Sequence, residues 1–228
     1  GRDDQQGPAA AKFIINKAKP KKVAVLHDKQ SYGQGIAASV RDELKKANVD
    51  VALFEGINAG DSDYSAVITK LKSAGADFVY YGGYHPEMGL LLRQAAEQGL
   101  KVRMMGPEGV GNPEINAIAG NAVEGMLVTL PADPASKPEN AALVKAFKDK
   151  GRDPSGAFQM GAYTATQVLA QSIKAVGDDA EKVADYLHKT TFNMPTGNVA
   201  WDAKGDLKAF DFPVYSWHKD GSKSVAEK

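Results

Sequence analysis

"VAVLHDKQSYGQG", residues 23–35, joins an uninterrupted apolar run to a cluster of polar, aromatic and glycine residues. A run without polar alternation is typical of a strand that is buried on both faces of a sheet. Behind the cluster, Ile36, Val40 and Leu44 recur at helical spacing, which predicts a helix. The cluster, which includes Tyr32, therefore lies where a buried strand ends and a helix begins.

The same alternation continues through the first half of the chain. Apolar runs that predict strands occupy residues 23–27, 51–57, 78–82, 102–105 and 126–130. Segments with helical spacing separate them, and Asp61 and Ser62 are suitable N-cap residues for the second helix. Strands that alternate with helices form βαβ units and a parallel sheet covered on both faces. The predicted fold class is therefore α/β, with a doubly wound parallel sheet.

The rest of the chain follows a different pattern. The opening "GRDDQQGP" reads as a loop that leads into a helix, and "PADPASKPEN", residues 131–140, reads as a linker because of its prolines. Helical patterns follow around residues 143–150, 158–176 and 183–187, with no strand predicted between them. Near the end, "DAKGD" predicts a turn and residues 214–217 predict a last strand.

The composition excludes several classes of function. Among 228 residues, Lys plus Arg total 28 and Asp plus Glu total 28, so the chain lacks the basic field that nucleic-acid binding needs. No apolar run approaches the ~18 residues of a membrane span. The chain contains no cysteine, which excludes disulfides, thiolate catalysis and Cys-based metal sites.

Residues that directly follow the strands are the candidate site, because ligands bind beyond the carboxyl ends of strands in such sheets. Tyr32 follows the first strand, Tyr84 and His85 follow the third, and Glu108 follows the fourth. A buried carboxylate needs a cationic partner, and a ligand ammonium group fits between Glu108 and the two tyrosines. This pattern predicts one wall of a small-molecule cleft. The alternative is structural, with Glu108 as a helix cap or solvated loop residue and Tyr84 as a packing residue.

Other chemistry finds less support in the sequence. His27 and Asp28 are adjacent, so their side chains point to opposite sides of a strand, and no G-x-S-x-G elbow accompanies them. The histidines at positions 27, 85, 188 and 218 lack metal-ligand spacing, and "GPEGVGN" is not a phosphate-binding motif. No cofactor, metal ion or catalytic residue is predicted, although a flavodoxin-like α/β enzyme that uses His27 and Asp28 stays open as an alternative.

Several motifs together resemble the branched-chain amino acid binding proteins, the leucine/isoleucine/valine receptors of bacterial ABC importers. They are "HDKQSYGQG", "DFVYYGGYHPEMG", "MGPEGVGN", "VEGMLVTLP", "DPSGAF" and "WDAKGDLKAFDF". The resemblance covers essentially the whole chain. It implies a type I periplasmic binding protein (Venus flytrap) architecture, in which two α/β lobes close on the ligand by a hinge. It also implies a periplasmic, non-enzymatic protein that delivers its ligand to an ABC permease.

The resemblance also assigns residues and lobes. Tyr32, Tyr84 and Glu108 match contacts that the second lobe of this family makes with the amino acid, with Glu108 as the acceptor of the ammonium group. Phe158 matches an aromatic residue that flanks the ligand. Residues 1–130 and 210–228 correspond to the C-terminal, ligand-binding lobe, which is nearly complete. Residues 131–209 correspond to a returning segment of the N-terminal lobe, which is incomplete.

The sequence departs from the family in one respect: members carry a further βαβ region before the equivalent of Gly1, and that region grips the ligand carboxylate. We therefore expect this chain alone to bind leucine weakly, and expect the N-terminal segment, in one chain or as a separate one, to restore binding. A split or sensor-type fragment of such a receptor is an alternative interpretation. The apolar stripe Phe158, Leu169, Ile173 and Val176 is expected to promote association.

Overall fold

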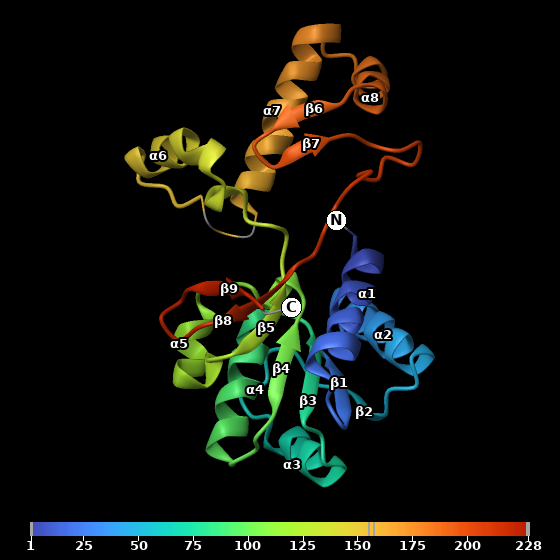
Figure 1. Cartoon of the computed structure of the whole chain (residues 1–228), viewed down its shortest axis with the longest axis vertical. Coiled ribbons are helices and arrows are strands. Elements are labelled where there is room, and N and C mark those ends of the chain that lie inside the picture. Colours follow the sequence, from blue (N-terminus) through green and yellow to red (C-terminus); the bar gives the residue numbers. More distant parts are fainter. Residues whose placement is uncertain (1, 155, 157, 227–228) are drawn as a thin grey trace. The chain divides into compact units, whose positions relative to one another are not determined.

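The computed structural model of the protein describes residues 2–154, 156 and 158–226. The chain forms two compact units (Figure 1), one made of Arg2–Leu130 and Phe212–Lys228 and the other of Pro131–Asp211. Within the described residues, no helix is long and apolar enough to cross a membrane.

The larger unit is built on a seven-stranded sheet with the order β2-β1-β3-β4-β5-β8-β9. The strands are β1 (Val23–His27), β2 (Val51–Gly56), β3 (Phe78–Gly82), β4 (Arg103–Gly106), β5 (Met126–Thr129), β8 (Val214–Trp217) and β9 (Lys223–Val225). Strands β1 to β5 run parallel, whereas β8 is antiparallel to β5 and β9 is antiparallel to β8. The prediction of an α/β fold with a parallel sheet is confirmed.

Helices cover both faces of this sheet (Figure 1). The helices are α1 (Asp3–Phe13), α2 (Ser31–Lys46), α3 (Ser65–Ala74), α4 (His85–Glu97) and α5 (Ile115–Ala119). A π-helical segment, η1 (Ile14–Ala18), extends α1, and η2 (Glu108–Val110) and η3 (Gly120–Val123) are short 3-10 helices. α1 and α2 pack on the face that carries Val25, Tyr80 and Met105. All residues of β1 and β3 are buried, which explains why their sequences are apolar without alternation.

The prediction of an opening loop is wrong, because α1 begins at Asp3 and continues through Pro8. Its first turn is closed by the Gln5 side chain, whose Oε1 accepts the backbone N–H of Arg2 at 3.1 Å. The buried Gln6 side chain donates from Nε2 to the carbonyl oxygen of Thr129 at 3.2 Å. These contacts outweigh the helix-breaking tendency of Gly7 and Pro8.

The predicted N-caps of the second helix are also wrong. That helix, α3, begins at Ser65, and its first backbone N–H donates to Oδ1 of Asp63 at 2.8 Å. The carboxyl group that satisfies the first turn therefore comes from Asp63, closer to the helix than Asp61 or Ser62.

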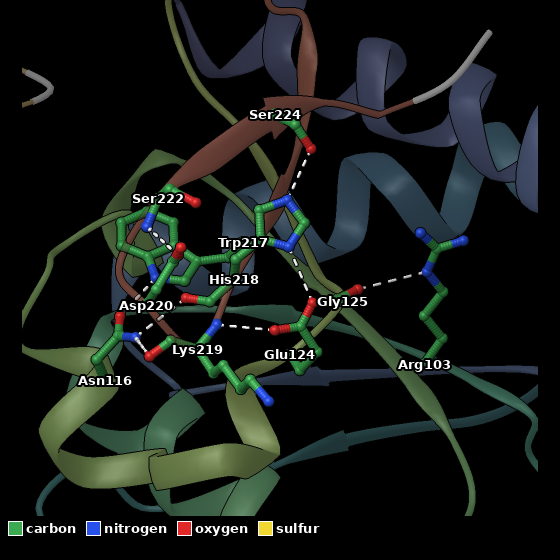
Figure 2. Close-up of polar contacts among 10 residues, drawn as sticks. All are labelled: Arg103, Asn116, Glu124, Gly125, Trp217, His218, Lys219, Asp220, Ser222 and Ser224. Carbon is green, nitrogen blue, oxygen red and sulfur yellow. Dashed lines mark hydrogen bonds and ion pairs between the residues drawn. The ribbon is translucent and has the colours of Figure 1, made fainter.

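A hairpin of β8 and β9 forms one edge of the sheet and is held by the His218 ring, as Figure 2 shows. His218 Nδ1 lies 2.9 Å from Oε1 of Glu124, and its Nε2 lies 2.8 Å from Oγ of Ser224. The second carboxyl oxygen of Glu124 accepts the backbone N–H of Lys219 at 2.9 Å. One imidazole thus links the hairpin turn and β9 to the segment that precedes β5.

Asn116 of α5 provides a second attachment for the same hairpin (Figure 2). Its Oδ1 accepts the indole N–H of the buried Trp217 at 2.6 Å. Its Nδ2 donates to the carbonyl oxygens of His218 and Lys219, each at 3.1 Å. The three-residue strand β9 was not predicted from the sequence, because it forms by pairing with β8.

The smaller unit contains α6 (Ala141–Asp149), α7 (Gln159–Val176), α8 (Ala180–Lys189), β6 (Phe192–Met194) and β7 (Gly197–Val199), with turns η4 (Pro134–Ser136) and η5 (Pro138–Asn140). Its core packs Val168 of α7 against Phe192 and Met194. The three helices were predicted and the β6–β7 hairpin was not. The predicted "DAKGD" turn is present, because the N–H of Asp202 donates to the carbonyl oxygen of Asp206 at 2.9 Å.

The chain leaves and re-enters the larger unit at neighbouring positions. β5 and β8 are paired side by side, with Thr129 opposite Val214. Just beyond this pair, the N–H of Leu130 donates to the carbonyl oxygen of Pro213 at 3.2 Å. The whole of Pro131–Asp211 is therefore inserted between two adjacent antiparallel strands.

Candidate functional site

Three loops meet at the carboxyl edge of the sheet, where its strand order reverses. The order β2-β1-β3-β4 places the reversal between β1 and β3, and crevices at such points bind ligands. Tyr32 lies in the first turn of α2, Tyr84 immediately precedes α4, and Glu108 begins η2. Because β1, β3 and β4 are neighbours, the residues that follow them come from adjacent loops.

The structure brings the two predicted tyrosines together. Their ring centroids lie 5.4 Å apart with an angle of 40° between the planes, which is a favourable distance for an aromatic pair. Tyr84 remains 48% exposed, so part of its ring is available to a ligand. The pair forms an aromatic surface at the reversal point of the sheet.

Gly109 joins Glu108 to this aromatic pair. Its backbone N–H donates to the Tyr32 hydroxyl oxygen at 3.3 Å. A Cβ atom at Gly109 would lie 3.1 Å from carbon atoms of both the Tyr32 and Tyr84 rings. The residue that follows Glu108 is thus close to both tyrosines, which places the backbone of the Glu108 loop beside the aromatic pair.

The electrostatics of this cluster favour a cation. Burial raises the pKa of the Glu108 carboxyl group, and repulsion from the Asp3 carboxyl group adds to the effect. Burial also raises the pKa of the Tyr32 phenol far above its ordinary value, so that hydroxyl stays protonated. A partly desolvated carboxylate beside phenol rings is stabilised when an ammonium group pairs with it.

Phe158, the fourth predicted site residue, belongs to the smaller unit. It immediately precedes α7, and its side chain is 64% exposed. Its role as an aromatic residue that flanks a ligand stays a prediction.

His27 and Asp28, at the end of β1, both have structural partners. The ring of His27 packs on Phe54 with centroids 5.1 Å apart, and its Nδ1 accepts the N–H of Lys29 at 3.1 Å. Burial lowers the pKa of His27, which favours the neutral ring. The Oδ1 atom of Asp28 instead accepts the N–H of Gln30 at 2.9 Å. Each of the two side chains thus accepts a backbone N–H of the loop between β1 and α2, and this geometry gives no support to a catalytic pair.

His85 lies 3.3 Å from Glu114 through its Nε2 atom. Across the described part of the chain, no three His, Cys, Asp or Glu side chains are grouped so that they could hold a metal ion.

Sequence reasoning missed the part that Gly109 plays. The motif "GPEGVGN" contains several glycines, and only the approach of η2 to the tyrosine rings shows which of them lies against the rings. The signal in the sequence is that a glycine directly follows the candidate carboxylate.

Comparison with known proteins identifies relatives over the whole chain. A family model described as "Periplasmic binding protein" matches residues 1–222. The chain is 58% identical over 225 residues to the leucine-, isoleucine-, valine-, threonine- and alanine-binding protein of Pseudomonas aeruginosa, covering 98% of this chain and 60% of that protein. It is 48% identical over 227 residues to the Leu/Ile/Val-binding protein of Escherichia coli, covering 100% and 62%. The chain thus spans about three-fifths of the length of these curated relatives.

Solved structures agree with this match. A leucine binding protein from Thermotoga maritima superposes with a TM-score of 0.88 at 31% identity, covering 99% of this chain and 65% of that one. A branched-chain amino acid binding protein from Streptococcus pneumoniae, solved with isoleucine, shares the fold with a TM-score of 0.84 at 23% identity, covering 99% and 65%. The predicted type I periplasmic binding protein architecture is therefore confirmed. With a family model matching nearly its whole length, the chain belongs to the periplasmic binding proteins, a family of solute-binding transport proteins and not of enzymes.

Proposed function

We propose that this chain is part of a periplasmic receptor that binds leucine, isoleucine and valine and delivers them to an ABC permease, without catalysing a reaction. The observation that carries the proposal is the half-buried Glu108 carboxyl group beside the Tyr32–Tyr84 pair at the reversal point of the sheet. Support also comes from the names of relatives that are 58% and 48% identical.

In this proposal each group recognises a different part of the amino acid. Glu108 accepts hydrogen bonds from the ligand ammonium group, which replaces the water that burial removes. The tyrosine rings contact the aliphatic side chain. Burying a leucine-sized side chain contributes about 1.5–3 kcal/mol, so the charged ends of the ligand must provide the rest of the affinity.

We further propose that a region corresponding to the unmatched two-fifths of the relatives completes the receptor, in the same chain or as a separate one. An apolar stripe runs from the residue before α7 along that helix. It consists of Phe158, Leu169 and Ile173, which are 64%, 48% and 46% exposed, and of Val176, which is half-buried. An exposed apolar stripe of this kind is typical of a surface that packs against another segment.

The test is leucine binding by a hybrid in which this chain is joined to the N-terminal region of the Pseudomonas aeruginosa relative. Isothermal titration calorimetry should detect binding of branched-chain amino acids by the hybrid and much weaker binding by the 228-residue chain alone. In the hybrid, Glu108→Gln should weaken leucine binding by about 100-fold, because a neutral amide cannot pair with the ammonium charge.

The matched control is Glu97→Gln on α4, whose carboxyl group is exposed and pairs only loosely with Arg93 at 3.9 Å. This variant should bind leucine like the unmodified hybrid. A hybrid that binds no branched-chain amino acid, or a Glu108→Gln variant that binds leucine with full affinity, would contradict the proposal.

A further inference from the structure

Asp28 links the ends of two neighbouring strands of the sheet. It directly follows β1, and its backbone N–H donates to the carbonyl oxygen of Gly82, the last residue of β3, at 3.1 Å. Asp28 is only 1% exposed. It is therefore a buried connection between the strand that leads to Tyr32 and the strand that leads to Tyr84.

The carboxyl group of Asp28 extends this connection to the start of α2. Its Oδ1 atom accepts the backbone N–H of Gln30, which immediately precedes that helix, at 2.9 Å. The same oxygen packs against the first turn, because a Cβ atom at Gly33 would lie 2.2 Å from it. Tyr32 lies between Gln30 and Gly33 in the chain, so one carboxyl group contacts the backbone on both sides of Tyr32.

The second carboxyl oxygen of Asp28, Oδ2, is buried and has no hydrogen-bond partner within the part of the chain that the structure describes. Burial of this kind disfavours the ionised form, and it raises the pKa of Asp28 above its usual 3.8. Repulsion from Glu87 adds to the rise, while the hydrogen bond from Gln30 and attraction to His27 oppose it. An exposed aspartate caps a helix without this cost, so the buried placement between two strands is what distinguishes Asp28.

We propose that Asp28 is a positioning residue, which fixes the backbone segments of Tyr32 and Tyr84 relative to each other through its own N–H and its Oδ1 atom. It touches no ligand and acts only through the placement of the two rings, whose centroids lie 5.4 Å apart. The expected effect on binding rests on the proposed function, whereas the effect on the rings is tested without a ligand.

The first test follows the rings in the 228-residue chain by NMR. In Asp28→Ala the side-chain acceptor is lost, so nuclear Overhauser effects between the Tyr32 and Tyr84 rings should disappear and amide hydrogen exchange at Gln30 should become faster. Asp28→Asn keeps an oxygen acceptor and should retain both signals. Unchanged ring signals in Asp28→Ala would overturn the inference.

The matched control is Asp63→Ala, at the start of α3 in the same unit. Oδ1 of Asp63 accepts the N–H of Ser65 at 2.8 Å, the same two-residue spacing as in Asp28, but Asp63 is exposed. This variant should lower the melting temperature and leave the ring signals unchanged. If it removed the signals as Asp28→Ala does, the effect would be one of general stability, and the positioning role would be refuted.

A pH profile tests whether the buried carboxyl group lies where the inference requires it. The ionisable side chains around Asp28 are Glu87 of α4, Tyr81 of β3, His27 of β1 and the adjacent Lys29, whose ammonium group donates to Asn58 at 2.7 Å. A carboxyl group with a raised pKa destabilises the folded state increasingly as the pH rises from its unfolded pKa through the folded value. Relative to the unmodified chain, Asp28→Asn should therefore have a higher melting temperature at pH 7 than its difference at pH 3 predicts. An equal difference at both pH values would contradict the buried placement and the inference with it.

The effect on binding is measured by calorimetry on the hybrid. Asp28→Ala should weaken leucine binding by about 10-fold, because small displacements of contact residues are costly. Asp28→Asn should bind within about threefold of the unmodified hybrid, and Asp63→Ala should bind as before. Full affinity in Asp28→Ala would overturn the inference. Failure of the unmodified hybrid to bind any branched-chain amino acid would instead refute the proposed function, and the ring signals would still decide the role of Asp28.

Discussion

At the scale of single residues, the site depends on places where two stretches of backbone touch. The end of β3 and the start of α2 meet at Gly82 and Gly33: a Cβ atom at Gly33 would lie 2.5 Å from the carbonyl oxygen of Gly82. This close approach brings the loop that carries Tyr32 against the loop that carries Tyr84. The absence of side chains at these glycines thus determines how near the two rings come.

Gly82→Ala should therefore destabilise the chain strongly. The new Cβ atom would collide with the carbonyl oxygen of Gly33, and overpacking against backbone costs about 2–3 kcal/mol in free energy of unfolding. Urea denaturation followed by circular dichroism measures the change. The control is Gly35→Ala in α2, where a Cβ atom meets nothing within 4 Å. It should be neutral or slightly stabilising because alanine favours helix. Equal stability of the two variants would refute this explanation.

Three of the four candidate residues, Tyr32, Tyr84 and Glu108, could be placed at one edge of the sheet from the sequence, because each lies in the loop after an apolar strand and such loops meet at the carboxyl ends of parallel strands. Phe158 follows no strand, and its assignment comes from the resemblance alone. Gly109 was beyond that rule, because its contact with two rings depends on distances between loops that are remote in sequence. Periodicity indicates which residues share an edge, and the packing of η2 determines which of them touch.

At the scale of elements, burial on both faces made β1 and β3 predictable to the residue, since their apolar runs coincide with the strands. Short elements were not predictable, because β6, β7 and β9 each have three residues and form only when a partner strand is in place. The start of α1 was mispredicted for a related reason. Long-range contacts of Gln6 outweigh a local sequence that favours a turn.

The β8–β9 hairpin yields a prediction about pH. The hydrogen bond from His218, joined by the N–H of Lys219, lowers the pKa of Glu124 below its usual 4.5. A carboxyl group with a lowered pKa stabilises the folded state above its unfolded pKa and loses that contribution as the pH falls through the folded value. Glu124→Gln should therefore lower the melting temperature at pH 7 and have little effect at pH 3.

Differential scanning calorimetry at both pH values measures this difference. Glu181→Gln, on the first turn of α8 in the smaller unit, controls for loss of a surface carboxylate. A Glu124→Gln variant whose melting temperature differs from that of the unmodified chain by the same amount at pH 3 and pH 7 would show that the carboxylate does not stabilise the hairpin.

At the scale of the whole molecule, the α7 stripe should control the solution behaviour of the 228-residue chain. Leu169 and Ile173 are about half exposed, so we expect concentration-dependent association through their apolar surface. Leu169→Lys combined with Ile173→Lys should shift sedimentation velocity profiles toward the monomer. The control is Thr166→Lys, at an exposed position of the same helix, which adds charge without removing apolar surface. A monomeric unmodified chain would contradict the expectation.

Leu130 and Pro213 are adjacent, so we expect that the smaller unit can be deleted without separating β5 from β8. Because Leu130 and Pro213, which flank the inserted segment, are joined by a backbone hydrogen bond of 3.2 Å, a short hairpin loop can bridge them. A shortened protein with Asn-Gly in place of residues 131–211 should then fold around an intact sheet, with β5 still paired to β8. Such a miniature would present Tyr32, Tyr84 and Glu108 on a scaffold small enough for complete NMR assignment.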